Sequence, residues 1–217
     1  MKINDLGRSM IEMLGVLAIV GILSVGAISG YSKAMFKYKL LKTAEEYTTL
    51  FQEVLPYKKE LEALRGAKAG EGDYYWLTPL FDDMQLVPKT WSRTVIPSKG
   101  QEGFIDRLGN YVWPFIRMEN NKLNFNILIT DSDTSVTICE TLYREVIMQF
   151  SDILSYTATV KDKNGGSETT SDKYYYGNMY CNGKNRKCIK DMSLKDIYEM
   201  CSICASDNRY CALIIDF

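Results

Sequence analysis

One long apolar stretch dominates the pattern of hydrophobic and polar positions along the chain. An uncharged run extends from Met13 to Ser32. At a helical rise of about 1.5 Å per residue, its roughly 20 residues are enough to cross the hydrocarbon core of a bilayer. The run therefore predicts a membrane-spanning helix. A single carboxylate, Glu12, stands at its edge, and because an unpaired charge is costly in lipid, this residue is a candidate for a functional role.

The helical pattern continues beyond the span, now with one apolar side. Apolar residues recur at the three- and four-residue intervals of an amphipathic helix, at Leu40, Leu41, Ala44, Tyr47, Leu50, Phe51, Val54 and Leu55. Charged side chains, Glu45 and Glu46 among them, occupy the other side. Pro56 is expected to kink or end the helix because it lacks a backbone donor, and helix-forming residues then extend to Arg65.

Shorter patterns fill the rest of the chain. Glycines and prolines punctuate residues 66–110, which predicts a connecting loop region with one short helix around 76–85. A further helix is expected over 134–154, and the glycine- and hydroxyl-rich residues 164–172 predict a surface loop. Strand patterns lie at 110–117, 123–130, 156–160, 173–181, 187–190 and 209–217.

The C-terminal part of the chain carries six cysteines: Cys139, Cys181, Cys188, Cys201, Cys204 and Cys211. An even number crowded into one region suits disulfides in an oxidising compartment. Cys181 and Cys188 flank a turn-like insert between two expected strands, so they are the best candidates for a local bridge. The alternative is a zinc site, for which Cys201 and Cys204 have the right local spacing, but no second close pair of this type and no histidine accompany them.

Composition argues against several classes of function. The chain has 217 residues, a formal net charge of -1 and a pI near 5.7, which gives no electrostatic case for nucleic-acid binding. It contains no histidine, and therefore no Ser-His-Asp or Cys-His arrangement. The acidic pairs Asp131 with Asp133 and Asp82 with Asp83 lack the fuller oxygen-ligand pattern of a calcium site. Because Cys201-x-x-Cys204 also lacks the context of a redox motif, we expect no enzyme activity, no metal and no cofactor.

The N-terminal residues resemble the prepilin signal of the type IV pilin and pseudopilin superfamily. In that signal a short basic leader ends in glycine, and glutamate is the fifth residue of the processed chain. The matching residues here are Gly7, Arg8 as the new N-terminus, and Glu12. Arg8 departs from the family, which usually carries Phe, Met or Leu at this position. The resemblance implies cleavage after Gly7 by a prepilin peptidase, methylation of the new terminus, and a role for Glu12 in assembly.

Two simpler interpretations account for part of this segment. A secretory signal peptide would be cleaved after the apolar region, at Ser24-Val25-Gly26 or Ala27-Ile28-Ser29, and a plain signal anchor would stay uncleaved. Neither explains why Glu12 stands five residues past Gly7. By the positive-inside rule, the lysines after the span would keep the C-terminal part in the cytosol; they are Lys33, Lys37, Lys39 and Lys42. The resemblance and the cysteines instead favour export.

A second resemblance concerns the C-terminal part of the chain. The order of expected elements is similar to that of the type IVb pilins: a strand is followed by a helix that carries Cys139, and Cys201 comes shortly before the last strand. In that subfamily two such cysteines form the disulfide that staples the C-terminal region to the sheet. The resemblance favours a bridge between Cys139 and Cys201, which leaves Cys204 with Cys211, while the residues by themselves leave the connectivity open. The other four cysteines have no counterpart in the subfamily.

These features predict an α+β fold. A long N-terminal helix, membrane-spanning in its first half and amphipathic in its second, packs on an antiparallel β-sheet with a disulfide-stapled C-terminal region. The expected parts are a leader at 1–7, the assembly half of the helix at 8–32, its amphipathic half at 33–65, the connecting region at 66–110, and the sheet with the Cys-rich region at 111–217.

The function implied by the resemblance is structural. The chain would be a subunit of a type IV pilus-like filament on the cell surface, made as a single-span precursor in the bacterial inner membrane with its C-terminal domain outside the cytoplasm. The implied partners are the prepilin peptidase, identical or related pilin subunits, the inner-membrane assembly platform and the membrane itself. The alternatives are a minor pilin, a pseudopilin of a type II secretion system, and an exported single-span binding protein that does not polymerise.

Overall fold

The computed structural model describes residues 4–64, 74–95, 100–117, 120–131, 133–162, 173–205 and 210–217, without the side chains of residues 4–9, 11, 162 and 210. The chain divides into two compact units, Met1–Lys39 and Leu40–Phe217. The predicted surface loop at 164–172 and the expected leader residues 1–3 lie outside the described residues.

The first unit consists of a helix over its described residues. It is the first part of α1 (Asn4–Val54), which runs without a break through Gly21 and Gly26. The helix predicted from the apolar run is therefore confirmed. Large apolar side chains along this run are more than half exposed in the chain by itself: Met13, Leu14, Val16, Leu17, Ile19, Val20, Ile22, Leu23, Val25 and Ile28.

In the second unit, the remainder of α1 buries one side in the core. The residues of this buried stripe are each 5% exposed or less: Leu40, Ala44, Tyr47, Leu50, Phe51 and Val54. Leu41, which the sequence pattern places on the apolar side, is instead 47% exposed, because it lies one position beyond the buried stripe. The predicted break at Pro56 is confirmed as a 3-10 turn, Leu55–Tyr57, followed by α2 (Lys58–Ala63).

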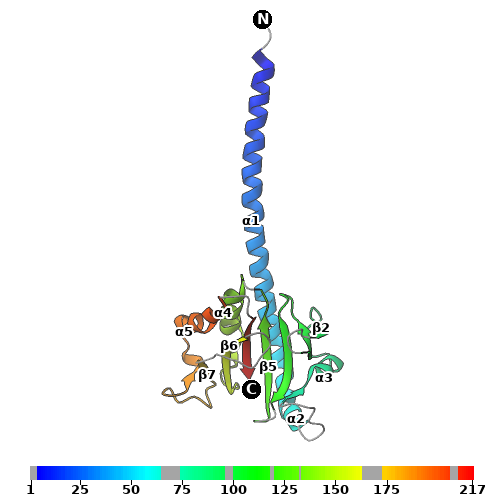
Figure 1. Ribbon diagram of the computed structural model, residues 1–217, viewed down its shortest axis with the longest axis vertical. Helices are drawn as coiled ribbons and strands as arrows, with labels where there is room; N and C mark the ends of the chain where they lie inside the picture. The colour runs from blue at the N-terminus through cyan, green and yellow to red at the C-terminus, as the bar shows by residue number, and fades with distance from the viewer. Residues whose placement is uncertain are drawn as a thin grey trace. The chain divides into compact units, whose positions relative to one another are not determined.

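A nine-stranded sheet forms the rest of the core within the described part of the chain. Its strands are β1 (Tyr74–Trp76), β2 (Ser92–Val95), β3 (Glu102–Ile105), β4 (Tyr111–Arg117), β5 (Lys122–Ile129), β6 (Tyr156–Asp162), β7 (Tyr174–Tyr176), β8 (Lys187–Cys188) and β9 (Tyr210–Asp216). The order is β2-β3-β4-β5-β9-β6-β7-β8, and β1 also pairs with β4. Figure 1 shows the last strand, β9, between β5 and β6. All these pairs are antiparallel except β7 with β8, so the predicted fold class is confirmed.

The region predicted as a connecting loop, 66–110, contributes three strands to this sheet. One end of β4 pairs with β3, Phe104 opposite Val112, and the other end pairs with β1, Trp76 opposite Phe115. Strands of three or four residues are too short to give a clear alternating pattern. Their backbone donors and acceptors are satisfied by pairing, of β1 and β3 with β4 and of β2 with β3. The helix expected here is shorter than predicted and forms α3 (Thr78–Asp83).

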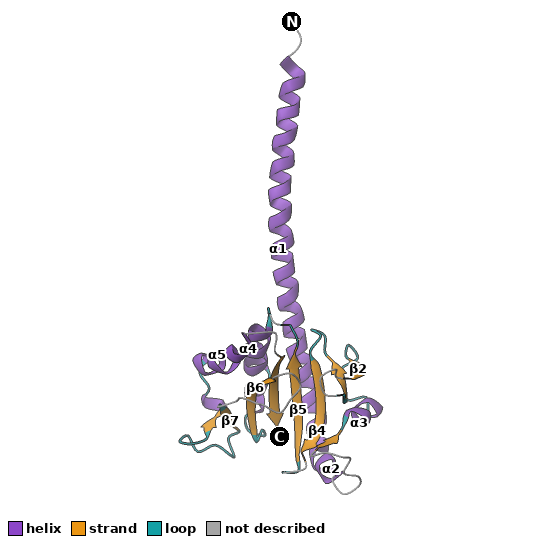
Figure 2. Ribbon diagram, viewed as in Figure 1, coloured by secondary structure: helices purple, strands orange, loops and turns teal. Residues whose placement is uncertain are grey.

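The helices after the central strands also differ from the expected ones. The helix predicted over 134–154 ends early: α4 (Ser135–Glu145) is followed by a 3-10 turn, Ile147–Phe150. A further helix, α5 (Leu194–Cys201), was not expected from the sequence pattern. It begins with a capping box in which the Ser193 hydroxyl accepts from the backbone N–H of Asp196, and the Asp196 side chain accepts from the backbone N–H of Ser193. Figure 2 shows α4 and α5 as neighbouring helices at one end of the sheet.

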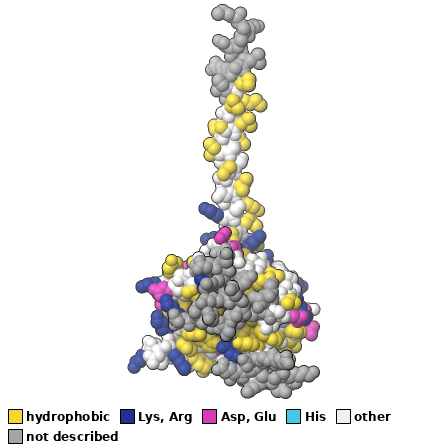
Figure 3. Space-filling view, viewed as in Figure 1, with side chains coloured by type: hydrophobic (Ala, Val, Ile, Leu, Met, Phe, Trp, Pro, Cys, Tyr) yellow, Lys and Arg dark blue, Asp and Glu magenta, His cyan; other side chains and the backbone are white. Residues whose placement is uncertain are grey.

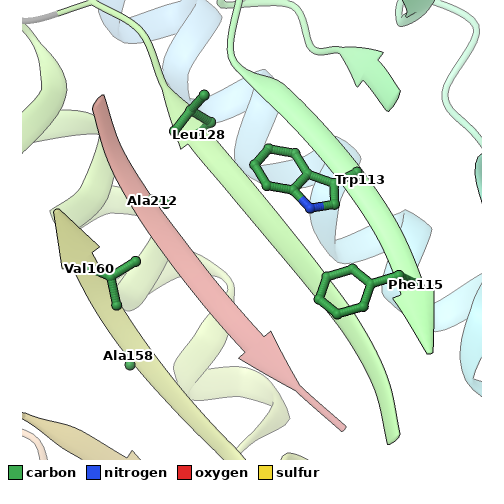
Figure 4. Close-up of a cluster of buried hydrophobic side chains, with 6 residues drawn as sticks. All are labelled: Trp113, Phe115, Leu128, Ala158, Val160 and Ala212. Atoms are coloured by element: carbon green, nitrogen blue, oxygen red, sulfur yellow. The ribbon is translucent and has the colours of Figure 1, made fainter. Parts of the chain in front are cut away.

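The central strands are buried on both faces. On the helix face, the Phe51 ring of α1 packs against Phe125, Phe150 and Phe217 with ring centroids 4.9, 5.5 and 5.3 Å apart. The opposite face carries a second cluster (Figure 4), made of Trp113, Phe115, Leu128, Ala158, Val160 and Ala212 from β4, β5, β6 and β9. Because side chains alternate between the faces of a strand, β4 and β5 present apolar residues to both clusters.

Candidate assembly and anchoring sites

The predicted processing residues lie inside helix α1. The backbone of Gly7 and Arg8 is helical, and the side chain of Arg8 lies outside the described residues. Glu12 is exposed and stands four positions after Arg8. Positions four apart lie on the same side of a helix, so this register places positions 8 and 12 next to each other at the start of the apolar run.

The apolar side chains that follow Glu12 are exposed in the described part of the first unit. Among the described residues, one helix is long and apolar enough to cross a membrane, with a mean hydropathy of 2.2 over an 18-residue window of which 0% is buried. Figure 3 shows hydrophobic side chains along this helix. Leaving a Leu or Ile side chain in water rather than burying it costs about 1.5 to 3 kcal/mol. An exposed apolar surface of this size is typical of a segment that other apolar groups cover.

The small residues of the run fit such surroundings. A Cβ atom added to Gly15, Gly21, Gly26 or Gly30 would meet nothing within 4 Å, so packing inside this chain does not require these glycines. In a membrane, glycines let neighbouring helix backbones approach closely. The hydroxyls of Ser24 and Ser32 donate to the carbonyls of Val20 and Ile28, at 2.7 and 2.9 Å. Both hydroxyls are thus satisfied without water.

A charged contact anchors the second part of α1 to the sheet unit. Glu46 accepts hydrogen bonds from Thr90 Oγ1 at 2.8 Å, Trp91 Nε1 at 3.0 Å and Arg107 Nη2 at 2.5 Å. Partial burial by itself raises the pKa of the Glu46 carboxyl, but the hydrogen bonds from Arg107, Thr90 and Trp91 outweigh it, so the pKa lies below its usual value. Glu46 is therefore held as a carboxylate.

A buried polar contact lies beside it. Tyr47 Oη donates to Asp106 Oδ2 at 2.9 Å, and Asp106 also accepts from the backbone N–H groups of Leu108 and Asn110 and from the Asn110 side-chain amide. Burial raises the pKa of Asp106, and the hydrogen bonds from Asn110 and Tyr47 offset this only in part. Sequence patterns did not identify Asp106 or Arg107, because contacts with residues 59 and 61 positions away leave no local signal.

Three disulfides hold the C-terminal region, and they confirm that part of the predicted fold class. Cys139 of α4 is joined to Cys201 of α5, Cys181 to Cys188, and Cys204 to Cys211 of β9. These are the same pairs as those preferred above. The first closes a span of 62 residues, and each of the other two closes a span of 7. In the chain-entropy description, a longer closed loop stabilises the folded state more.

Several of the other residues considered in the sequence have structural partners. Cys201 and Cys204 belong to different disulfides. Asp82 pairs with Arg93 at 3.1 Å, and Asp131 accepts from the backbone N–H of Asp133. In the part of the chain that the structure describes, no group of three or more metal-ligating side chains is present.

The fold and its N-terminal segment together define a class of α+β protein with one exposed apolar helix and a disulfide-bonded sheet unit. No protein-family model matches the chain, and no curated protein matches its sequence. Among solved structures, the crystal structure of a type IV b pilin from Salmonella typhi matches with a TM-score of 0.42 and 10% sequence identity, over 81% of this chain and 97% of that one.

Proposed function

We propose that this chain is a structural subunit of a type IV pilus-like filament. The observation that carries the proposal is the uncovered apolar surface of α1 directly after Glu12. A helix of this kind fits a lipid bilayer before assembly and a bundle of identical helices after it, because both surroundings bury apolar side chains. The buried stripe from Leu40 to Val54 ties the other end of the same helix to the sheet unit.

Processing after Gly7 belongs to the proposal. Cleavage there removes the leader and creates an α-amino group on Arg8, one helical turn from Glu12. In the apolar interior of a filament, both the amine and the carboxylate need an opposite charge nearby. An ion pair between Glu12 of one subunit and the amine of its neighbour satisfies both and fixes how far one helix is shifted along the other.

Export of the sheet unit is the second element of the proposal. All six cysteines are paired in the structure, and disulfides persist in oxidising compartments. The lysines after the span favour the opposite orientation. The proposal gives the disulfides more weight, because three bonds among six cysteines are hard to reconcile with a reducing cytosol.

The experiment is to express the full chain in a bacterium that has a prepilin peptidase and an assembly platform. Mass spectrometry of the purified protein gives its N-terminus, and electron microscopy of sheared surface material shows whether filaments contain it. A terminus at Arg8 with filaments built of the chain supports a major subunit, and a trimmed chain found at low level in filaments of another protein indicates a minor pilin or pseudopilin. An intact Met1 in the absence of filaments would instead indicate a non-polymerising membrane protein.

A further inference from the structure

The Cys181–Cys188 disulfide closes a small loop at one edge of the sheet. Strand β8 ends the strand order and pairs with β7 in parallel, Tyr175 opposite Lys187 and Tyr176 opposite Cys188. The loop therefore stands at the border of the sheet unit, away from the stripe of α1 that packs on the central strands.

The closed loop is held by its own hydrogen bonds. Asn182 Oδ1 accepts from the backbone N–H groups of Lys184 and Arg186, each at 3.0 Å. The backbone N–H groups of Asn182 and Gly183 both donate to the Arg186 carbonyl at 3.1 Å. Gly183 has a φ of 68°, a left-handed conformation that glycine adopts without strain. The disulfide and these bonds fix the loop before any ligand arrives, which lowers the entropic cost of binding.

The loop is basic although the chain is not. Residues 182–187 include Lys184, Arg186 and Lys187 and no acidic residue, whereas the whole chain has a net charge of -1. Lys187 lies 3.7 Å from Asp196, but Lys184 and Arg186 are exposed and have no carboxylate partner among the described residues. A local excess of positive charge therefore faces solvent here. Figure 3 shows dark blue Lys and Arg side chains at the lower left of the view, where Figure 1 draws the loop beside β7.

A hollow of about 320 Å³ lies between this loop and β7. Three lysines, three tyrosines and one asparagine line it: Lys173, Tyr174, Tyr175, Tyr176, Lys184, Asn185 and Lys187. No acidic residue is among these lining residues. The volume is at the lower end of the range of small-molecule sites, about 300 to 1,000 Å³. The chemistry of the lining fits an anion that also carries hydrogen-bonding groups.

The tyrosine rings narrow the choice of ligand. Arg186 Cζ lies 5.3 Å from the ring centre of Tyr176, and Lys187 Nζ lies 5.5 Å from that of Tyr175. One face of each ring is thus taken by a cation of the chain itself, which leaves fewer free ring faces for the stacked bases of a single-stranded nucleic acid. Lys173 and Lys187 are paired with Glu199 and Asp196, and the Tyr175 hydroxyl donates to Asp196 at 2.7 Å. What remains is the charge of Lys184 and Arg186, the phenol groups of Tyr174 and Tyr176 and the Asn185 amide, a set that fits carboxylate or sulfate groups carried on a hydroxyl-rich chain.

We propose that the hollow between the Cys181–Cys188 loop and β7 binds an anionic glycan that carries carboxylate or sulfate groups. Lys184 supplies uncompensated positive charge in the lining, and Arg186 supplies it from beside the lining residue Tyr176. Asn185 and Tyr174 supply hydrogen bonds to sugar hydroxyls. Such a site on an exported domain gives the protein a binding function in addition to the proposed filament role. The site is formed within one copy of the chain, so it does not depend on that role.

The test is titration calorimetry with the full chain in detergent. The probes are a heparin oligosaccharide, which carries sulfates and carboxylates, and a hyaluronan oligosaccharide, which carries carboxylates alone. We expect saturable binding of at least one of them. In Lys184→Glu/Arg186→Glu, we expect binding to weaken by at least about tenfold, since two charged contacts are replaced by repulsive ones. Binding of heparin but not hyaluronan would show that sulfate groups are required, and binding of hyaluronan would show that carboxylates are sufficient; either supports the proposal.

The matched control is Lys59→Glu/Lys89→Glu, which changes net charge equally at two exposed residues outside the hollow. We expect its affinity to stay within about twofold of wild type. Both variants are compared by thermal unfolding and by mass mapping of the disulfides, so a folding defect is recognised separately. The proposal is overturned if neither glycan binds, if the control loses as much affinity as the loop variant, if neutral maltodextrin binds equally well, or if oligodeoxythymidine binds more tightly than both glycans.

Discussion

Tyr47 and Asp106 form a buried hydrogen bond between the long helix and the turn after β3, with 2.9 Å between Tyr47 Oη and Asp106 Oδ2. Next to this pair, Glu46 and Arg107 form a second bond from the same two segments. Adjacent residues of the helix therefore contact adjacent residues of the turn. This double contact holds the part of the helix that belongs to the sheet unit, from Leu40 onward, in place on the turn after β3.

Removing the tyrosine hydroxyl should destabilise the fold. In Tyr47→Phe, the buried Asp106 carboxyl loses one of its four donors and keeps those of Leu108 and Asn110. The loss of one hydrogen bond to this group should cost about 1 to 2 kcal/mol. Chemical denaturation of the full chain in detergent measures the change in the free energy of unfolding. Tyr57→Phe, at a tyrosine that is 44% exposed, is the control and should change stability by less than about 0.5 kcal/mol. Equal stability of the two variants would contradict the anchoring role of Tyr47.

The Glu46 contact should make stability depend on pH. Because the pKa of folded Glu46 lies below its ordinary value of 4.5, the unfolded chain takes up the proton first as the pH falls. The contribution of this carboxylate is therefore complete above about pH 5.5 and is lost as the pH falls below about 4.5.

This predicts how Glu46→Gln compares with wild type. The variant should be less stable by about 1 to 2 kcal/mol near neutral pH, and the difference should shrink as the pH falls from about 5.5 to 3. The pKa of Asp106 is raised rather than lowered, so its contribution to stability changes with pH in the opposite direction. Because Asp106 is present in both proteins, this contribution cancels when their stabilities are compared. The control is Glu45→Gln, which removes the same charge from a more exposed ion pair with Lys42. We expect this variant to lose less than about 0.5 kcal/mol of stability. A difference that stays constant over this pH range would argue against the charged contact.

The three disulfides should contribute unequally. Replacing Cys139 and Cys201 by serine opens a span of 62 residues, and the chain-entropy model predicts a loss of about 4 kcal/mol. Replacing Cys181 and Cys188 opens a span of 7, with an expected loss of about 2 kcal/mol. Denaturation under non-reducing conditions measures both, and peptide mapping of the untreated protein should detect no free thiol. Free thiols throughout would reject the exported, disulfide-bonded state.

Processing should depend on the glycine at the end of the leader. We predict that Gly7→Asp blocks trimming, because a charged side chain replaces the smallest residue where the peptidase must approach the backbone. Mass spectrometry of membrane fractions from cells with an active prepilin peptidase should find a chain that starts at Arg8 in wild type and the untrimmed precursor in the variant. Asp5→Gly, within the leader, is a control that should be trimmed normally. Trimming of Gly7→Asp at the wild-type rate would place the cleavage site elsewhere.

Glu12 should act in assembly rather than in insertion. We predict that Glu12→Ala inserts and is trimmed normally, since removing a charge makes the span more apolar. Incorporation into filaments should fall sharply, because the amine of the neighbouring subunit would then be buried without a partner. Membrane precursor, trimmed product and sheared filaments are quantified separately. A normal filament yield from this variant would show that the carboxylate does not direct assembly.

Much of this protein could be predicted from local sequence patterns. The apolar run from Met13 to Ser32, the helical spacing from Leu40 to Val54 and the break at Pro56 each reflect a preference that a residue shares with neighbours a few positions away. The longer strands, β4, β5, β6 and β9, were found for the same reason. The even number of cysteines in one region also predicted that it is disulfide-bonded.

The tertiary structure decided what these elements contact. The three short strands of 66–110 complete their hydrogen bonds by pairing: β1 and β3 pair with β4, and β2 pairs with β3. The place of β9 between β5 and β6 depends on the whole sheet. The pairing of Glu46 with Arg107 and of Tyr47 with Asp106 joins residues 61 and 59 positions apart. A sequence pattern indicates which side of a helix is apolar. The partner of each side chain depends on which surfaces meet in the folded core, and this is determined by all the packed elements together.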